Sequence, residues 1–150
     1  MITVQQVFHG LFGAWRLFLY DRDAIRLFED SLEGYWKSFS CAAIILPGYT
    51  VLIYSTLADF LTTANIVRVT LIEGICYIIG WVAWPLVMAY VAPLLDRHKT
   101  YIRYIVAYNW STLIQVAILL SLLAFQTTGF SSDATFTGVG VACAIILLLY

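Results

Sequence analysis

Charged side chains are scarce in this chain of 150 residues: they make up 11% of it, while 62% of its residues are hydrophobic. A typical soluble domain carries about 25% charged residues and about half apolar ones. A core of this size cannot hide so much apolar surface, so we expect lipid to cover it. The net charge of -1 excludes the basic surface that nucleic-acid binding requires, and we expect no nucleic-acid partner.

Groups that carry chemistry are also scarce. The sequence has no Walker motif, GxSxG, HExxH or paired carboxylates within one apolar stretch. Its two histidines, His9 and His98, lie outside the apolar stretches, which excludes axial ligation of haem inside a membrane. Cys41, Cys76 and Cys143 form neither a CxxC nor a Cys/His cluster. We therefore expect no catalytic residues, no cofactor, no metal site and a protein that is not an enzyme.

Long apolar stretches predict an all-α, polytopic transmembrane helical bundle. Each approaches the ~20 residues that cross a ~30 Å hydrocarbon core. The expected spans are residues 38–58, 67–92, 101–125 and 134–150. This divides the chain into an amino-terminal segment, residues 1–37, and a transmembrane domain, residues 38–150. The last stretch is still apolar at Tyr150, so we expect the natural chain to continue, with room for a fifth span.

Residues 1–37 predict cytoplasmic amphipathic helices. Large apolar side chains in residues 4–20 follow helical spacing, and a second helix capped by Asp23 would carry an apolar face as far as Phe39. Such helices suit the headgroup layer of a membrane, and they also suit a hairpin packed on another protein. The side chains expected to contact lipid or a partner are Phe8, Phe12, Trp15, Phe28 and Trp36.

Basic residues predict the orientation of the spans. Seven of the eight Lys and Arg residues either precede the first span or surround residues 96–103. Because positive loops stay on the side of insertion, we expect a cytoplasmic amino terminus and a cytoplasmic 96–103 loop. Residues 59–67 and 126–133 then face outward. In a bacterium, the membrane would be the inner membrane.

Few polar side chains interrupt the spans. Glu73 is the most costly of them, because a carboxylate within a span costs roughly 2.5–3.5 kcal/mol. Counting from Pro93 places it ~30 Å from the cytoplasmic end. We expect a carboxylate near the outer interface that is hydrogen-bonded to a neighbouring helix; a proton or cation site is the alternative.

The third span carries a polar stripe that includes Tyr101, Tyr104, Tyr108, Ser111 and Gln115. Lipid offers these groups no hydrogen bonds, so we expect the stripe to face other helices. Packing between helices is the favoured interpretation, and a substrate or ion path is the alternative.

Depth and facing predict one contact between spans. Tyr77 shares a face of the second span with Glu73, and equal depth predicts a contact between Tyr77 and Gln115. Trp81 and Trp84 either pack against neighbouring helices or line a quinone pocket. Pro47 predicts a bend in the first span.

Two segments resemble the Yip-type (Rab-interacting) membrane proteins and their bacterial relatives. Residues 17–28 (LFLYDRDAIRLF) lead into short-looped spans, and residues 101–108 (YIRYIVAY) follow the basic loop. Members of that family typically have five spans and a cytoplasmic amino terminus, and they act in membrane trafficking or shaping. The resemblance implies no catalytic residues.

Two functions remain open from the sequence. The first is a non-enzymatic accessory subunit or scaffold of a membrane complex, or a membrane-organising protein, with lipids and either protein partners or further copies of itself as contacts. The second is a small transporter or channel subunit that uses Glu73 and the stripe from Tyr108 to Gln115.

Overall fold

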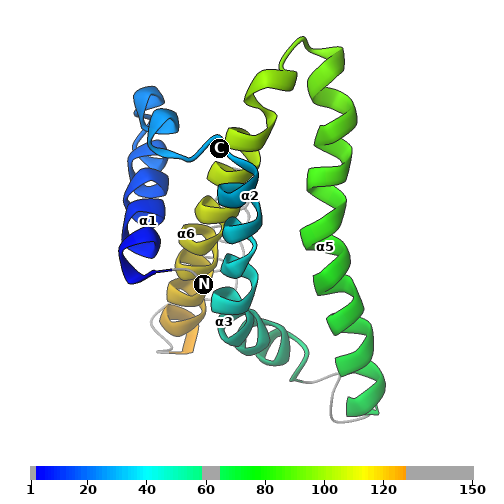
Figure 1. Ribbon diagram of the computed structural model, residues 1–150. Coiled ribbons are helices and arrows are strands. Elements are labelled where there is room, and N and C mark those ends of the chain that lie inside the picture. The colour runs from blue at the N-terminus through cyan, green and yellow to red at the C-terminus, as the bar shows by residue number, and fades with distance from the viewer. Residues whose placement is uncertain (1–2, 59–64, 128–150) are drawn as a thin grey trace.

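The computed structural model describes residues 3–58 and 65–127, and every regular element in these ranges is a helix. Figure 1 shows α3, α5 and α6 as the long elements, with α1 beside them. The expected fourth span, residues 134–150, lies outside the described residues. The elements in chain order are α1 (Val4–Phe18), the 3₁₀ turn η1 (Arg22–Leu27), α2 (Leu32–Ser38), α3 (Ser40–Thr56), α5 (Ile66–Leu94), the 3₁₀ turn η2 (His98–Thr100) and α6 (Tyr101–Thr127).

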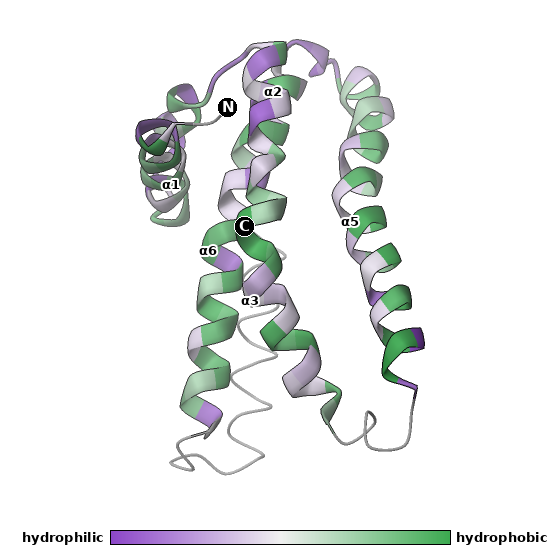
Figure 2. Cartoon of the chain, turned by 60° about the horizontal axis from the view of Figure 1, so that its bottom comes forward, coloured by the Kyte–Doolittle hydropathy of each residue, from purple (hydrophilic) through white to green (hydrophobic). Residues whose placement is uncertain are grey.

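Three helical stretches in the described part are long and apolar enough to cross a membrane: Leu32–Thr56, Ile66–Leu94 and His98–Gln126. Apolar residues run along α3, α5 and α6 in Figure 2, while hydrophilic ones concentrate toward the end where α2 begins. The last two stretches lie close to the predicted spans. The first begins at Leu32 rather than at residue 38, because only a turn at Phe39 separates α2 from α3.

The connection between α1 and α2 corrects the prediction of one helix beginning at Asp23. The side chain of Asp21 accepts a hydrogen bond from the Asp23 N–H and begins the short turn η1 instead. The chain is extended at Phe28, and Ser31 Oγ then accepts from the Gly34 N–H at 3.0 Å to begin α2. Asp21 and Ser31 therefore each cap an element of their own, and the predicted single helix is divided into η1 and α2.

Local sequence fixes both ends of α1. Thr3 and Gln6 form a capping box, in which the Thr3 N–H donates to Gln6 Oε1 at 3.0 Å. At the other end Tyr20 has a φ of 63°, and the Asp21 N–H donates to the Arg16 carbonyl at 3.0 Å, as in a Schellman motif. Arg16 and Asp21 also form an ion pair between their side chains.

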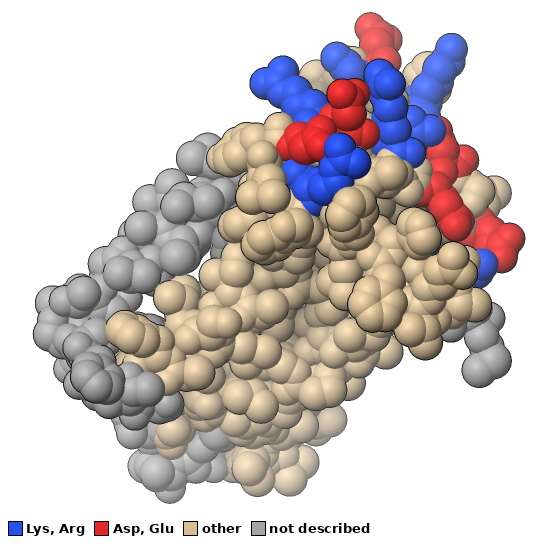
Figure 3. All heavy atoms as spheres, turned by 90° about the vertical axis from the view of Figure 1, so that its left-hand side faces the viewer, with Lys and Arg blue, Asp and Glu red and all other residues tan. Residues whose placement is uncertain are grey.

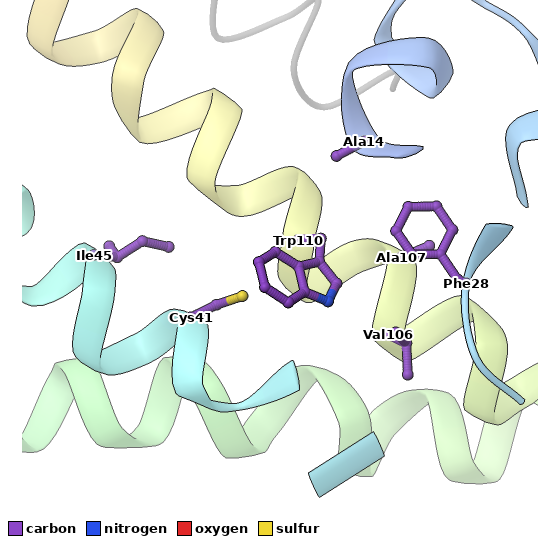
Figure 4. Close-up of a cluster of buried hydrophobic side chains, with 7 residues drawn as sticks. All are labelled: Ala14, Phe28, Cys41, Ile45, Val106, Ala107 and Trp110. Carbon is purple, nitrogen blue, oxygen red and sulfur yellow. The ribbon is translucent and has the colours of Figure 1, made fainter. Parts of the chain in front are cut away.

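The core of the described bundle lies where α1, α3 and α6 meet. Figure 4 shows its side chains, which come from α1 (Ala14), from the connection at Phe28, from α3 (Cys41 and Ile45) and from α6 (Val106, Ala107 and Trp110). Beside this cluster, Asn109 Nδ2 donates to Ser38 Oγ at 2.8 Å, and both residues are fully buried. This bond joins α2 to α6 within the core.

The first span stays helical through Pro47. Gly48 follows, and a Cβ atom there would lie 2.9 Å from Leu120 Cδ1. The pair predicted to bend the span therefore also lets α3 approach α6 closely.

Candidate functional site

Small residues attach α1 to the bundle. Gly10, Gly13 and Ala14 are its buried residues. A Cβ atom at Gly10 would overlap the buried indole of Trp110, and one at Gly13 would lie 2.8 Å from Phe28 Cζ. Only a hydrogen atom fits at these two positions, so the backbone of α1 comes very close to α6 and to Phe28.

Five large apolar side chains of α1 are exposed, whereas Val7 and Leu17 pack against the core. Phe8 is 69% exposed, Phe12 57% and Trp15 51%. We call the exposed set the outward face of α1; it consists of Val4, Phe8, Phe12, Trp15 and Leu19. A contiguous apolar surface of this kind marks a site of contact with lipid or protein.

A polar side of α1 separates the outward face from the bundle. Gln5, His9 and Arg16 recur at helical spacing on this side. Figures 1 and 2 together show that α1 lies across α6 rather than along it, because α1 is foreshortened in Figure 2 while α6 extends down the picture. Figure 3 shows that Lys, Arg, Asp and Glu side chains on that face gather at one end of the molecule.

The residues predicted to contact lipid or a partner separate into two groups. Phe8, Phe12, Trp15 and Trp36 are exposed. Phe28 is not available for docking, because it is only 5% exposed and its ring fills the space over Gly13. The helix break after η1 turns Phe28 inward, away from the face that periodicity had assigned to it.

Helix α5 contacts the other helices chiefly through aromatic side chains. Of its 29 residues, only Val69, Pro85 and Ala92 are buried. The Tyr77 hydroxyl donates to the Ala42 carbonyl at 2.6 Å. Further along, the Tyr101 hydroxyl donates to the Pro85 carbonyl at 2.9 Å. These rings bridge α5 to α3 and α6.

A continuous series of rings follows the boundary between α5 and the α2–α3 span, and we call it the aromatic seam. Its members are Tyr35, Phe39, Trp81, Tyr77 and Tyr49, in spatial order. The ring centroids are 5.2 Å apart for Tyr35 and Phe39, 6.5 Å for Phe39 and Trp81, and 6.2 Å for Trp81 and Tyr77. Tyr77 and Tyr49 complete the series at 4.6 Å.

Glu73 lies at the end of the aromatic seam. The Tyr49 hydroxyl donates to Glu73 Oε2 at 3.0 Å, which provides the partner on a neighbouring helix that a carboxylate in a span requires. Among the described residues, Glu73 forms no ion pair. The carboxyl group of Glu73 is therefore bonded to Tyr49 and has no basic partner in the described part of the chain.

A cavity of about 250 Å³ opens along the seam. Rings from three helices line it, namely those of Tyr49, Tyr77, Trp81 and Tyr108. Cys76 and Thr112 add a thiol and a hydroxyl to the wall. The cavity is thus aromatic, with a few polar groups. Glu73 does not line it, but its carboxyl group accepts the hydrogen bond of Tyr49, which does.

The structure brings some of the polar residues predicted within the spans together, but not all of them. Tyr77 and Tyr108 line this cavity, and Glu73 is hydrogen-bonded to Tyr49 of its wall. Tyr77 donates to Ala42 rather than to Gln115, and Gln115 is half-buried elsewhere on α6. The expected Tyr77–Gln115 contact is therefore replaced by a bond to α3.

Sequence reasoning missed Tyr49, which is central to the site. Its only signal in the sequence is a phenol within the first span, two residues after Pro47. Trp81 packs on Phe39 and Tyr77, as interhelical packing predicts, and it also lines the cavity.

A larger cavity of about 410 Å³ opens between the start of α1, α2 and α6. Its wall carries His9, Glu29 and Lys37, so it presents both signs of charge. Lys37 already pairs with Glu33 at 2.7 Å. Glu29 forms no ion pair among the described residues, and no further polar contact at this cavity identifies a ligand.

No family model, curated protein or solved structure matches this chain. The resemblance to Yip-type proteins stays a prediction from the sequence. The functional argument therefore rests on the outward face of α1 and on the cavity beside Glu73.

Proposed function

We propose that this chain is a non-enzymatic membrane-organising protein or scaffold subunit, anchored in the cytoplasmic leaflet by α1. One observation supports the proposal above all others. Helix α1 uses its glycines to bind α6 and leaves Phe8, Phe12 and Trp15 uncovered. A helix that only completed the core would bury its large side chains and expose its small ones.

Lipid is the occupant that best fits the outward face. The helix lies across the bundle, carries a polar side with Arg16, and sits at the end where charges gather. These are the properties of a helix in the plane of the interface. Transfer of each large apolar side chain from water into lipid is favourable by roughly 1.5–3 kcal/mol. The positive residues at this end support a cytoplasmic location, which in a bacterium means the inner membrane.

The wider role follows from that placement. An in-plane helix on the cytoplasmic side suits a protein that organises lipid around itself or holds other subunits in place. The resemblance to Yip-type proteins, which act in membrane trafficking or shaping, agrees with this role. Partner subunits or further copies of the chain would then bind elsewhere on the exposed spans.

Spin labels on two sides of α1 test the placement. Phe12→Cys and His9→Cys would be labelled in full-length protein whose native cysteines are replaced by alanine, and then reconstituted into liposomes. Both parent residues are exposed, so the two variants are matched. We expect relaxation by oxygen, which concentrates in lipid, for the Phe12→Cys label, and relaxation by an aqueous nickel chelate for the His9→Cys label.

Two other outcomes would reject lipid as the occupant. A Phe12→Cys label accessible to neither reagent would show that protein covers the outward face. A label accessible mainly to the nickel chelate would place the face in water. In the first case a partner-docking scaffold would replace the membrane-organising role.

A small transporter or channel subunit is the second candidate function. Glu73 favours it, because a carboxylate without an ion pair in a span is a common feature of transport sites. Flux through liposomes that is unchanged by Glu73→Gln would remove this residue from any transport path.

A further inference from the structure

We propose that the cavity beside Glu73 binds an amphiphilic organic cation, with an ammonium head among the rings and a hydrocarbon tail among the lipids. The proposal names a substrate class for the second candidate function. It concerns binding alone, so it stands apart from transport and from the placement of α1.

The charge of the site selects a cation. Glu73 is held by Tyr49 and has no positive partner in the described part of the chain. Arg68 precedes it on the same helix, but it is exposed and pairs with no acid among the residues described. A carboxyl group without an ion pair favours a ligand that brings a positive charge.

The aromatic wall selects an organic cation over a metal ion. Tyr49 and Tyr77 have ring centroids 4.6 Å apart, and Trp81 follows at 6.2 Å from Tyr77. The faces of such rings attract ammonium groups, most strongly where water is absent. Hard metal ions need several oxygen ligands, and the described residues contain no group of three His, Cys, Asp or Glu side chains that could bind one.

The size and openness of the cavity define the shape of the ligand. Its volume of about 250 Å³ is below the ~300–1,000 Å³ of sites for drug-sized molecules. A small substituted ammonium head therefore fits better than a bulky polycyclic cation. Gly80 and Cys76 line the cavity yet are exposed on α5, and nothing lies within 4 Å of a Cβ atom built at Gly80. A hydrocarbon tail can leave between these residues.

Titration calorimetry on the full chain in a neutral detergent tests the proposal. The probe is benzyltrimethylammonium, and its uncharged carbon isostere is neopentylbenzene. We expect the wild type to bind the cation at least tenfold more tightly than the isostere. Glu73→Gln should reduce cation affinity at least tenfold and leave isostere affinity unchanged. Glu33→Gln is the matched control, because Glu33 is exposed and lies outside the cavity, so cation affinity should not change.

Three further variants distinguish the effects of charge and of the aromatic rings from a general loss of structure. Tyr49→Phe keeps both the ring and the carboxylate, so it should retain cation binding within about threefold. Trp81→Leu should weaken the cation more than the isostere. Thr70→Val removes another hydroxyl contact between α3 and α5, the one with Tyr54, and should not alter binding.

Two results would overturn the proposal. One is equal cation affinity in the wild type and Glu73→Gln, and the other is a wild type that does not prefer the cation to its isostere. Cation binding without flux in liposomes would keep the site and reject transport. If dodecylphosphocholine displaces the probe, the natural ligand is a lipid headgroup. If only dodecyltrimethylammonium displaces it, the natural ligand is a free amine.

Discussion

Replacing Gly10 by alanine tests the attachment of α1 directly. The added methyl group would overlap the indole of Trp110, which is only 5% exposed and cannot swing into solvent. Gly74→Ala is a matched control, since Gly74 also lies inside a helix and no atom lies within 4 Å of its built Cβ. The same chemical change is thus made once in a tight contact and once in open space.

The two variants should change the free energy of unfolding in different directions. Alanine stabilises a helix interior relative to glycine by roughly 0.8–1 kcal/mol, and both variants gain this amount. Overpacking a rigid site typically costs about 1–3 kcal/mol, and only Gly10→Ala incurs this loss. We therefore expect Gly74→Ala to be stabilised by up to about 1 kcal/mol. Gly10→Ala should lie about 1–3 kcal/mol below it, at or under wild-type stability.

Titration with sodium dodecyl sulfate, followed by far-ultraviolet circular dichroism, measures the free energy of unfolding of each variant in mixed micelles. Adding Trp110→Leu to Gly10→Ala should recover stability, since a smaller side chain relieves the overlap. The coupling free energy between the two sites should then exceed about 0.5 kcal/mol. Equal stabilisation by Gly10→Ala and Gly74→Ala would refute the packing of α1 on α6 through this glycine.

Two further predictions use the same titration. Ser38→Ala should lower the free energy of unfolding by about 1–3 kcal/mol, because it leaves the buried Asn109 amide without its acceptor. Ser38→Ala combined with Asn109→Leu should recover most of that loss. A larger loss in the double variant would contradict the role of this pair. Tyr20→Gly and Asp96→Gly should each stabilise the protein by about 1 kcal/mol, because both residues hold positive φ angles of 63° and 55°; destabilisation by both changes would show that contacts of these side chains outweigh the backbone strain.

The sequence predicted the long spans well, because their signal is local. The residues of α5 and α6 are apolar over more than a membrane thickness, and polar residues or proline flank each run. The start of the first span was less predictable. Ser31 and Asp21 both have cap chemistry, and only the inward turn of Phe28 decides between one long helix and two short elements.

The packing of α1 shows a second limit of prediction from local sequence patterns. Periodicity predicts Phe8, Phe12 and Trp15 on one face, and all three are exposed, yet periodicity cannot predict which face of the helix packs on the protein. That outcome depends on Trp110, about a hundred residues later, whose indole lies over Gly10. The Asn109–Ser38 bond joins residues 71 positions apart and was equally invisible to local patterns. For the candidate site, Glu73 and Tyr77 were identified, whereas Tyr49 was not.

Helix α5 is held mainly by hydrogen bonds from the polar groups of aromatic side chains, and this has a mechanical consequence. Helices α1, α3 and α6 interlock through glycine contacts and a shared core, so displacing one of them would break many close contacts at once. Helix α5 has only three buried residues and is joined by a few phenol and indole hydrogen bonds. It should therefore tilt or rotate under load before α3 or α6, which with α1 act as a fixed frame.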